Sequence, residues 1–137
     1  MPVYQAPGVY VEEVPGTPPI AGVGTSTAAF IGVVVDDVQM PLKPGSDTER
    51  LPLTPLLKPT LVTSFDQFKN KFGDFQAGNQ LLAHAAFGYF LNGGSRCHVI
   101  RVSDLGDAAE VQDALDEFAK IDEIAIVAAP GALTADV

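Results

Sequence analysis

The sequence predicts an α/β fold, with a mixed, partly parallel sheet flanked by helices and preceded by an extended N-terminal arm. From residue 27 onward, apolar runs alternate with segments of helical periodicity, an order typical of sheets with parallel strand pairs. Five prolines among the first 20 residues exclude a helix there, because proline fixes φ and removes a backbone donor. The length of 137 residues fits one domain, and the 47% of hydrophobic residues argues against global disorder.

The arm contains a strand that has no nearby partner in the sequence. Val9 and Val11 share one face and Tyr10 and Glu12 share the other, which is the two-residue alternation of a half-buried strand. The residues that follow contain no short turn leading into a second alternating strand, so a local hairpin is a poor explanation. The partner strand must therefore lie far away in the sequence or on another chain.

The end of this strand and the stretch after it have alternative interpretations. Glu12 and Glu13 either keep the strand end solvated and discourage unwanted pairing, or orient the arm against basic residues of a neighbouring chain. Gly22 and Gly24 precede a predicted strand, whereas phosphate-binding glycine loops follow a strand and open a helix. We therefore interpret these glycines as a hinge between arm and core.

The predicted core begins with a buried strand and a long loop. Residues 27–35 form a nearly continuous apolar run rich in β-branched side chains, typical of a central strand buried on both faces. Prolines at 41, 44, 52, 55 and 59 exclude a regular helix from residues 36–59. We expect a long loop with at most a short edge ribbon, and its length favours a contact surface over a passive connector.

Two helices are predicted next. Ser64 and Gln67 form a predicted capping box, and Gly73 ends the first helix. Asn79 is the expected N-cap of the second helix, which ends at the glycine pair 93–94. The apolar stripes consist of Phe65, Phe68 and Phe72 in the first helix and Leu82, Ala85, Ala86, Tyr89 and Phe90 in the second.

The last part of the chain predicts a strand, a helix and a strand. Residues 97–102 have the composition of a strand, and residues 124–130 are predicted to be another buried strand. Asp107 and Glu110 form a second predicted capping box at the start of the third helix. The core face of this helix is expected to carry Val111, Ala114, Leu115 and Phe118.

The charge distribution disfavours several classes of partner. Seventeen acidic and eight basic residues give a net charge of -9, which repels nucleic-acid phosphates and anionic lipid headgroups. Residues 104–123 carry eight carboxylates and one lysine, while residues 1–42 carry no Lys or Arg. The apolar runs are too short to span a bilayer, and the first residues do not resemble a secretion signal. We expect no nucleic-acid partner, no membrane insertion and synthesis in the cytoplasm.

The sequence shows no catalytic constellation. Cys97 is the only cysteine, which excludes an intrachain disulfide and fits a reducing compartment. Cys97 and His98 are expected on opposite faces of their strand, so they cannot act together as nucleophile and base. His84 stands alone on a predicted helix, and the carboxylates of residues 104–123 have the spacing of a solvated helix face. We expect no enzymatic activity, no cofactor and no metal site.

Five segments occur in a fixed order along residues 4–131. They are YQAPGVYVEEV, PIAGVGTSTAAFIG, LVTSFDQFKNKFG, FLNGGSRCHVIRV and ALDEFAKIDEIAIVAAPG. In this order they closely resemble the N-terminal part of contractile tail sheath proteins. Those proteins form the sheaths of contractile phage tails and of related bacterial contractile injection systems.

The resemblance implies a structural subunit. In that family, subunits stack as hexameric rings around a rigid inner tube, terminal arms lend strands to neighbouring subunits, and contraction drives the tube through a target envelope. The implied partners are neighbouring copies of the subunit, the inner tube protein, and baseplate and terminator proteins. The implied location is the bacterial cytoplasm during assembly, and then a phage tail or an injection particle.

The resemblance also divides the chain and assigns roles to its residues. Residues 1–21 would form the arm and tether, and residues 22–137 would form part of the sheath core, including the loop at 36–59. Family subunits are considerably longer, so we expect this core to be truncated at its C-terminus. The implied hinge and tether glycines are Gly16, Gly22 and Gly24. The implied strand-donating residues are Pro7, Gly8, Val9, Tyr10, Val11, Glu12 and Glu13.

Two other functions compete with the sheath. A small α/β ligand-binding or enzymatic domain is compatible with the order of strands and helices, because one fold hosts many functions. It would require polar groups that converge at a strand end, and the turn at Gly94 and the region of Gly131 each offer at most one. A baseplate or tube component of the same machine is disfavoured, since the resemblance is to the sheath.

Overall fold

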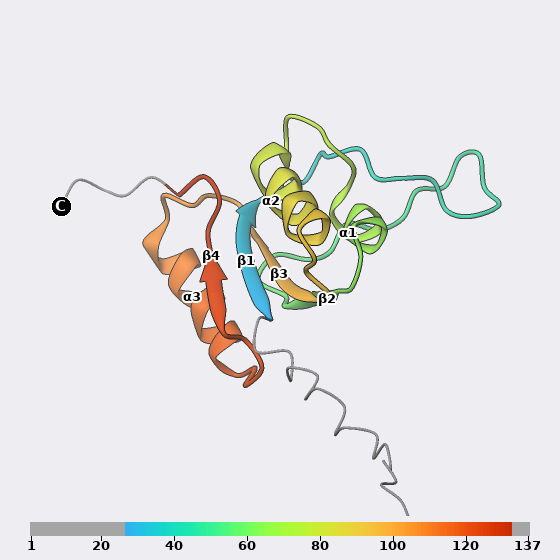
Figure 1. The fold of residues 1–137 in the computed structure, drawn as a ribbon. Helices are drawn as coiled ribbons and strands as arrows, with labels where there is room; N and C mark the ends of the chain where they lie inside the picture. The colour runs from blue at the N-terminus through green and yellow to red at the C-terminus, as the bar shows by residue number, and fades with distance from the viewer. Residues whose placement is uncertain (1–26, 133–137) are drawn as a thin grey trace, which may run out of the picture.

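Three parallel strands and one antiparallel edge strand organise the structure. The computed structural model describes residues 27–132, and its sheet has the strand order β2-β3-β1-β4 (Figure 1). β1 (Ala28–Val33) lies between β3 (Cys97–Val102) and β4 (Ile126–Ala128) and is parallel to both. β2 (Thr60–Val62) pairs with β3 in the antiparallel direction. The predicted α/β class with a mixed, partly parallel sheet is confirmed, whereas the predicted arm lies outside the described residues.

Helices cover both faces of this sheet. α1 (Phe65–Phe72) and α2 (Gln80–Leu91) lie on one face, and α3 (Ala108–Ala119) lies on the other (Figure 1). Successive residues of a strand point to opposite faces, so Phe30 packs with the cluster under α1 and α2 while Ile31 packs with the cluster under α3. β1 is therefore buried on both faces, as its apolar run predicts.

Close packing of β1 against α2 depends on a glycine in the strand. A Cβ atom placed on Gly32 would lie 2.7 Å from the Cβ of Leu82, and Leu82 is fully buried. Two carbon atoms cannot approach so closely, so a side chain at this position forces the strand and the helix apart.

We expect Gly32→Ala to lower the free energy of unfolding by about 1–3 kcal/mol, because the overpacked core must distort. Gly88→Ala is the matched control, since a Cβ on Gly88 in α2 would meet no atom within 4 Å. This second substitution should raise the free energy of unfolding by about 1 kcal/mol through helix propensity. Urea denaturation measures both changes, and a shift of the same sign in the two variants would contradict the packing argument.

In each of the two predicted capping boxes, only one of the two expected hydrogen bonds forms, the one accepted by the N-cap side chain. Ser64 Oγ accepts a hydrogen bond from the backbone N–H of Gln67, and Asp107 Oδ1 accepts one from the backbone N–H of Glu110. The side chains of Gln67 and Glu110 do not return to these N-caps but tie each helix to the strand before it. Their acceptor oxygens bind the backbone N–H of Thr63 in the first case and of Ser103 and Asp104 in the second.

Asn79 is the N-cap residue of α2, as predicted, but its side chain makes no capping hydrogen bond to the helix. Its amide nitrogen donates to the carbonyl oxygens of Phe72, Gly73 and Asp74, at 3.0, 3.1 and 2.9 Å. Its Oδ1 accepts from the backbone N–H of Gln76 at 3.1 Å. The side chain is buried and satisfies the turn between α1 and α2, which leaves no acceptor for the first turn of α2.

β4 differs from the prediction of a buried strand over residues 124–130. Among residues 27–132 it is a three-residue edge strand that pairs only with β1, and Ile126 and Val127 are 60% and 41% exposed. The apolar run was a poor guide to burial here because β-branched residues suit an edge strand as well as a central one.

Residues 34–59 form the long loop that the prolines predict. One isolated antiparallel bridge, between Leu42 and Arg50, provides the expected short ribbon. The loop then returns to the sheet, where the N–H of Leu57 donates to the carbonyl oxygen of Arg101 at 3.2 Å.

The side chain of Arg101 holds this loop against the sheet. Arg101 lies in β3, is 6% exposed, and donates from Nε to the carbonyl oxygen of Thr54. Its Nη1 donates to the carbonyl oxygen of Val34 at 3.0 Å and to Asp36 Oδ1 at 2.9 Å. One guanidinium therefore joins β3, the end of β1 and the long loop.

Candidate functional site

The residues that the sequence assigns to strand donation and to the hinge lie outside residues 27–132. These are residues 7–13 and the glycines at 16, 22 and 24. The described residues provide two kinds of surface that bear on function. One is a pocket at the end of the parallel strands, and the other is the pair of open sheet edges.

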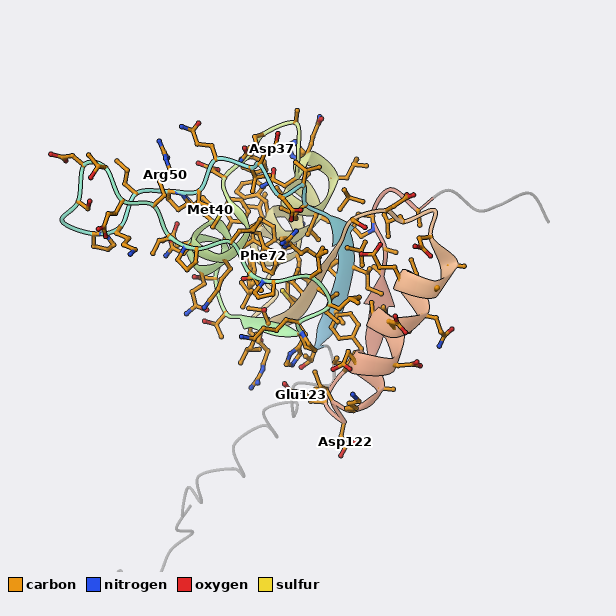
Figure 2. The ribbon with its side chains drawn as sticks, turned by 180° about the vertical axis from the view of Figure 1, so that it is seen from behind. Asp37, Met40, Arg50, Phe72, Asp122 and Glu123 are labelled. Atoms are coloured by element: carbon orange, nitrogen blue, oxygen red, sulfur yellow. The ribbon has the colours of Figure 1, made fainter. Side chains whose placement is uncertain are left out.

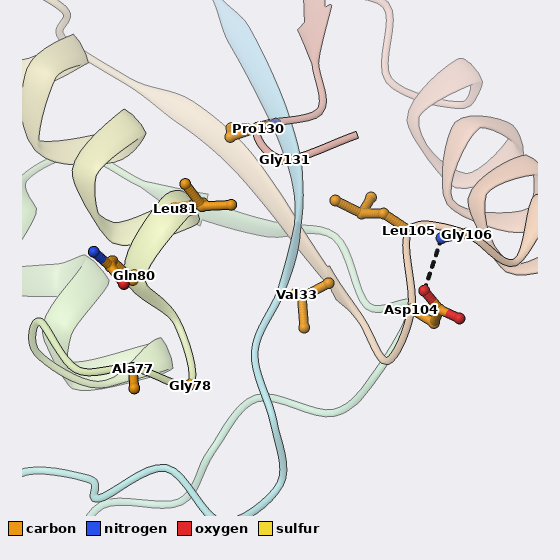
Figure 3. A pocket seen from close by; sticks show the side chains of 10 residues that line it. All are labelled: Val33, Ala77, Gly78, Gln80, Leu81, Asp104, Leu105, Gly106, Pro130 and Gly131. Carbon is orange, nitrogen blue, oxygen red and sulfur yellow. Dashed lines mark hydrogen bonds between the residues drawn. The ribbon is translucent and has the colours of Figure 1, made fainter. Parts of the chain in front are cut away.

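The pocket has a volume of about 470 Å³ and lies at the carboxyl ends of the three parallel strands (Figure 3). Val33 lines it from the end of β1, Leu105 from the turn after β3 and Pro130 from the turn after β4. The chain passes from β1 to β3 over one face of the sheet and from β3 to β4 over the other. Ligands of parallel α/β proteins bind at such a reversal of strand order.

The chemistry of this pocket is sparse. Its only polar side chains, among the described residues, are Asp104 and Gln80. Asp104 Oδ1 already accepts the backbone N–H of Gly106 at 2.8 Å, as the dashed line in Figure 3 shows. The pocket therefore has the position of a ligand site without the converging polar groups that fix a ligand's orientation.

A polar cluster lies at the opposite, amino-terminal end of β3. Glu123 Oε1 lies 2.6 Å from His98 Nε2 and 2.9 Å from Arg96 Nη2. The hydrogen bond with His98 and the charge of Arg96 hold the pKa of Glu123 below its usual value. This cluster ties the turn before β4 to β3, in the region where Figure 2 labels Asp122 and Glu123.

The lowered pKa predicts how the contribution of Glu123 depends on pH. A carboxyl group with a depressed pKa stabilises the fold above its unfolded pKa of 4.5, and this stabilisation is lost as the pH falls through the folded value. We expect Glu123→Gln to unfold more easily than wild type at pH 7, with a difference that shrinks below pH 4.5. Thermal melts between pH 3 and 7 measure it. Asp122→Asn is the control, and an equal pH dependence in both variants would contradict the role of this cluster.

The single cysteine is not suited to nucleophilic chemistry. Cys97 is fully buried on the face covered by α1 and α2, and burial raises the pKa of its thiol to about 12. The thiol thus stays protonated near neutral pH, and thiols react as thiolates. His98 Nε2 is hydrogen-bonded to the Glu123 carboxylate, and the ring of His84 contacts the ring of Phe75 at a tilt, with centroids 4.7 Å apart.

Neither a metal cluster nor a membrane span occurs in the part of the chain that the structure describes. Within residues 27–132, no three His, Cys, Asp or Glu side chains are placed to share a metal ion. No helix of the same range has the length and apolar character needed to cross a bilayer.

Both edges of the sheet are open within the described residues. β2 pairs only with β3 and leaves Leu61 40% exposed, while β4 pairs only with β1 and leaves Ile126 60% exposed. Edges of this kind are templates for strands of other chains. The sequence did not predict β2, because three residues after Pro59 are too few to show an alternation.

The buried Arg101 was also missed. An arginine within an otherwise apolar strand was the available signal, since a buried guanidinium must find acceptors. In comparisons with known proteins, no protein-family model matches the chain, and no curated protein matches it significantly.

Proposed function

We propose that this chain is a structural subunit of a contractile sheath, which stacks as hexameric rings around an inner tube and contracts to drive that tube through a target envelope. The observation that carries the proposal is the predicted strand around Val9 and Val11, which lacks a partner in its own sequence neighbourhood. The resemblance of five ordered segments to tail sheath proteins supports it. So does a sheet whose described part has two open edges.

Strand donation provides a physical basis for such an assembly. An extended arm that adds to the sheet edge of another copy gains affinity from main-chain hydrogen bonds and register from alternate side chains. The arm and the edge are different surfaces, so the contact is head-to-tail and propagates into rings and helical stacks. The proposed role needs no catalytic group. The proposed partners are neighbouring copies, the inner tube protein, and baseplate and terminator proteins.

Electron microscopy of particles that incorporate a gold-labelled copy of the chain tests this proposal. Assembly in the bacterial cytoplasm should yield label at regular intervals along the whole shaft of a phage tail or injection particle. Label confined to one end would assign the chain to the baseplate instead. Unlabelled shafts in a strain that makes the labelled chain would contradict the sheath assignment.

A ligand-binding or enzymatic α/β domain is the second candidate, and the pocket at the carboxyl ends of β1, β3 and β4 favours it. Thermal stabilisation in a screen of nucleotides and metabolites would support this candidate, because a ligand that binds the native state raises its stability. Asp104→Ala and Gln80→Ala should then abolish the shift. The scarcity of polar groups in the pocket makes this function the weaker of the two.

A further inference from the structure

A long groove lies beside the free edge of β2. It has a volume of about 990 Å³ and runs between the 34–59 loop and α1. Its apolar lining includes Leu42, Leu51 and Leu53 from the loop and Leu61 from β2. The outer side of β2 pairs with no strand of residues 27–132. The groove therefore combines an open strand edge with apolar side chains, which is the arrangement that binds extended segments by strand addition.

The groove is basic on a protein that is strongly acidic. Lys58 and Lys71 line it, and none of its lining residues is Asp or Glu. Both lysines are exposed, and neither forms an ion pair with a described residue. The other three lysines are each paired: Lys43 with Glu49, Lys69 with Asp66 and Lys120 with Glu117. Two unpaired ammonium groups at an open strand edge favour an extended segment that carries carboxylates.

One segment of this chain has the required pattern. The predicted strand places Val9 and Val11 on one face and ends in Glu12 and Glu13. We infer that residues 8–13 of a second copy bind in the groove, add as a strand to the free edge of β2, and place their two carboxylates near Lys58 and Lys71. This inference rests on the proposed function and identifies the acceptor site for the donated arm.

The other sheet edge is a poorer acceptor for the same segment. The groove beside β4 is lined by apolar residues and by Asp122. The neighbouring helix α3 carries Asp116 and Glu117, and Lys120 forms an ion pair with Glu117. A strand ending in two glutamates would meet charges of its own sign there. Figure 2 labels Asp122 near the end of α3, far from Arg50 on the long loop.

The tether favours a second copy over the arm's own chain. Pro15, Pro18 and Pro19 follow the predicted strand closely. Prolines in such a cluster favour a stiff, extended segment, so the sequence predicts a spacer between the strand and the core of its own chain. Such a spacer favours the groove of a neighbouring copy over the groove of the same chain.

Charge exchange between arm and groove tests the inference in the full chain. The arm variant is Glu12→Lys with Glu13→Lys, and the groove variant is Lys58→Glu with Lys71→Glu. Sedimentation velocity measures the protein concentration at which half of the chains are assembled. Each variant alone should require a concentration about tenfold higher than wild type, because two attractive pairs become repulsive. An equimolar mixture should assemble within about threefold of wild type, since the exchanged charges again match between chains.

The control variant is Lys69→Glu with Lys120→Glu, which makes the same change in net charge outside the groove and should assemble like wild type. Circular dichroism melts confirm that every variant is folded. Wild-type assembly by the groove variant would overturn the inference, as would a mixture that fails to assemble. A further variant carries the arm and groove substitutions in one chain. If this variant forms a compact monomer while the mixture fails to assemble, the groove binds the arm of its own chain, which also overturns the inference.

The failure of this inference can be told apart from failure of the proposed function. If the groove variant assembles normally but removal of residues 1–14 stops assembly, the arm donates its strand to another edge and only the groove assignment is wrong. If removal of the arm also leaves assembly intact, or if the wild-type chain stays monomeric at all concentrations, strand donation itself is wrong.

Discussion

A chain that lacks residues 1–14 should remain folded and soluble but should not assemble. The described members of the hydrophobic clusters on both faces of the sheet lie between Ala28 and Ala129, so the deletion removes none of these residues. It removes the only strand that the sequence predicts to pair with another chain. We expect the assembled fraction to fall at least about tenfold, because each donated strand contributes the main-chain hydrogen bonds of one intersubunit contact. Sedimentation velocity and electron microscopy measure this fraction.

Two point variants separate strand pairing from a general effect of the arm. Val9→Pro removes one backbone donor and fixes φ in the middle of the predicted strand, so it should weaken assembly nearly as much as the deletion. Glu12→Ala removes a single charge and should change assembly by less than about threefold, because exposed ion pairs contribute little. Normal sheaths from the deleted chain, or equal effects of the two point variants, would contradict strand donation.

Replacing Arg101 with methionine should lower the free energy of unfolding by about 2–4 kcal/mol, since hydrogen bonds from a charged donor to buried acceptors are among the stronger ones. The substitution leaves the carbonyl oxygens of Thr54 and Val34 without their donor. Arg96→Met is the control. It removes an arginine that directly precedes β3, where the ion pair with Glu123 is partly exposed and contributes at most about 1 kcal/mol to stability.

Limited proteolysis localises the effect of this substitution. Trypsin cleaves poorly before proline, and both Lys43 and Lys58 precede a proline, so Arg50 is the cleavable site in the 34–59 loop. Arg101→Met should speed cleavage after Arg50 by about tenfold, because release of the loop exposes it more often. Unchanged cleavage together with unchanged stability would show that Arg101 does not hold the loop.

The sequence was sufficient where an element is long and its pattern is strong. The apolar run that contains β1 and the composition of residues 97–102 predict strands that the structure contains, and Phe68 and Phe72 lie on the buried face of α1 as their spacing predicts. These elements are specified locally, since their periodicity and the residues at their ends agree. The α/β class follows from their order along the chain.

Other features depend on distant residues and could not be predicted. β2 is a strand only because the edge of β3 is available to residues 60–62. The exposure of β4 depends on its place at the end of the sheet, which the apolar composition of residues 126–128 does not encode. The side chains of Asn79 and Glu110 bind turns instead of the predicted helix termini, because buried or neighbouring backbone groups compete for them.

The candidate acceptor groove shows the same limit. Lys58 belongs to the proline-rich loop and Lys71 to the last turn of α1, and nothing in their local sequence relates them. The fold places both beside β2, and the paired states of Lys43, Lys69 and Lys120 single them out. The arm is predicted to have valines on one face and two glutamates at its end. The surface that matches this pattern can be recognised only in the tertiary structure.

The central position of β1 has a mechanical consequence. The chain enters the described fold at Thr27, directly before β1, and β1 is joined to β3 by six register pairs and to β4 by three. A force applied along β1 loads the hydrogen bonds to both neighbouring strands in shear, so that these bonds bear the load together. Peeling would break such bonds one after another at a much smaller force. Under the proposed sheath function, a subunit tethered through its central strand would transmit tension to its neighbours while its own sheet stays intact.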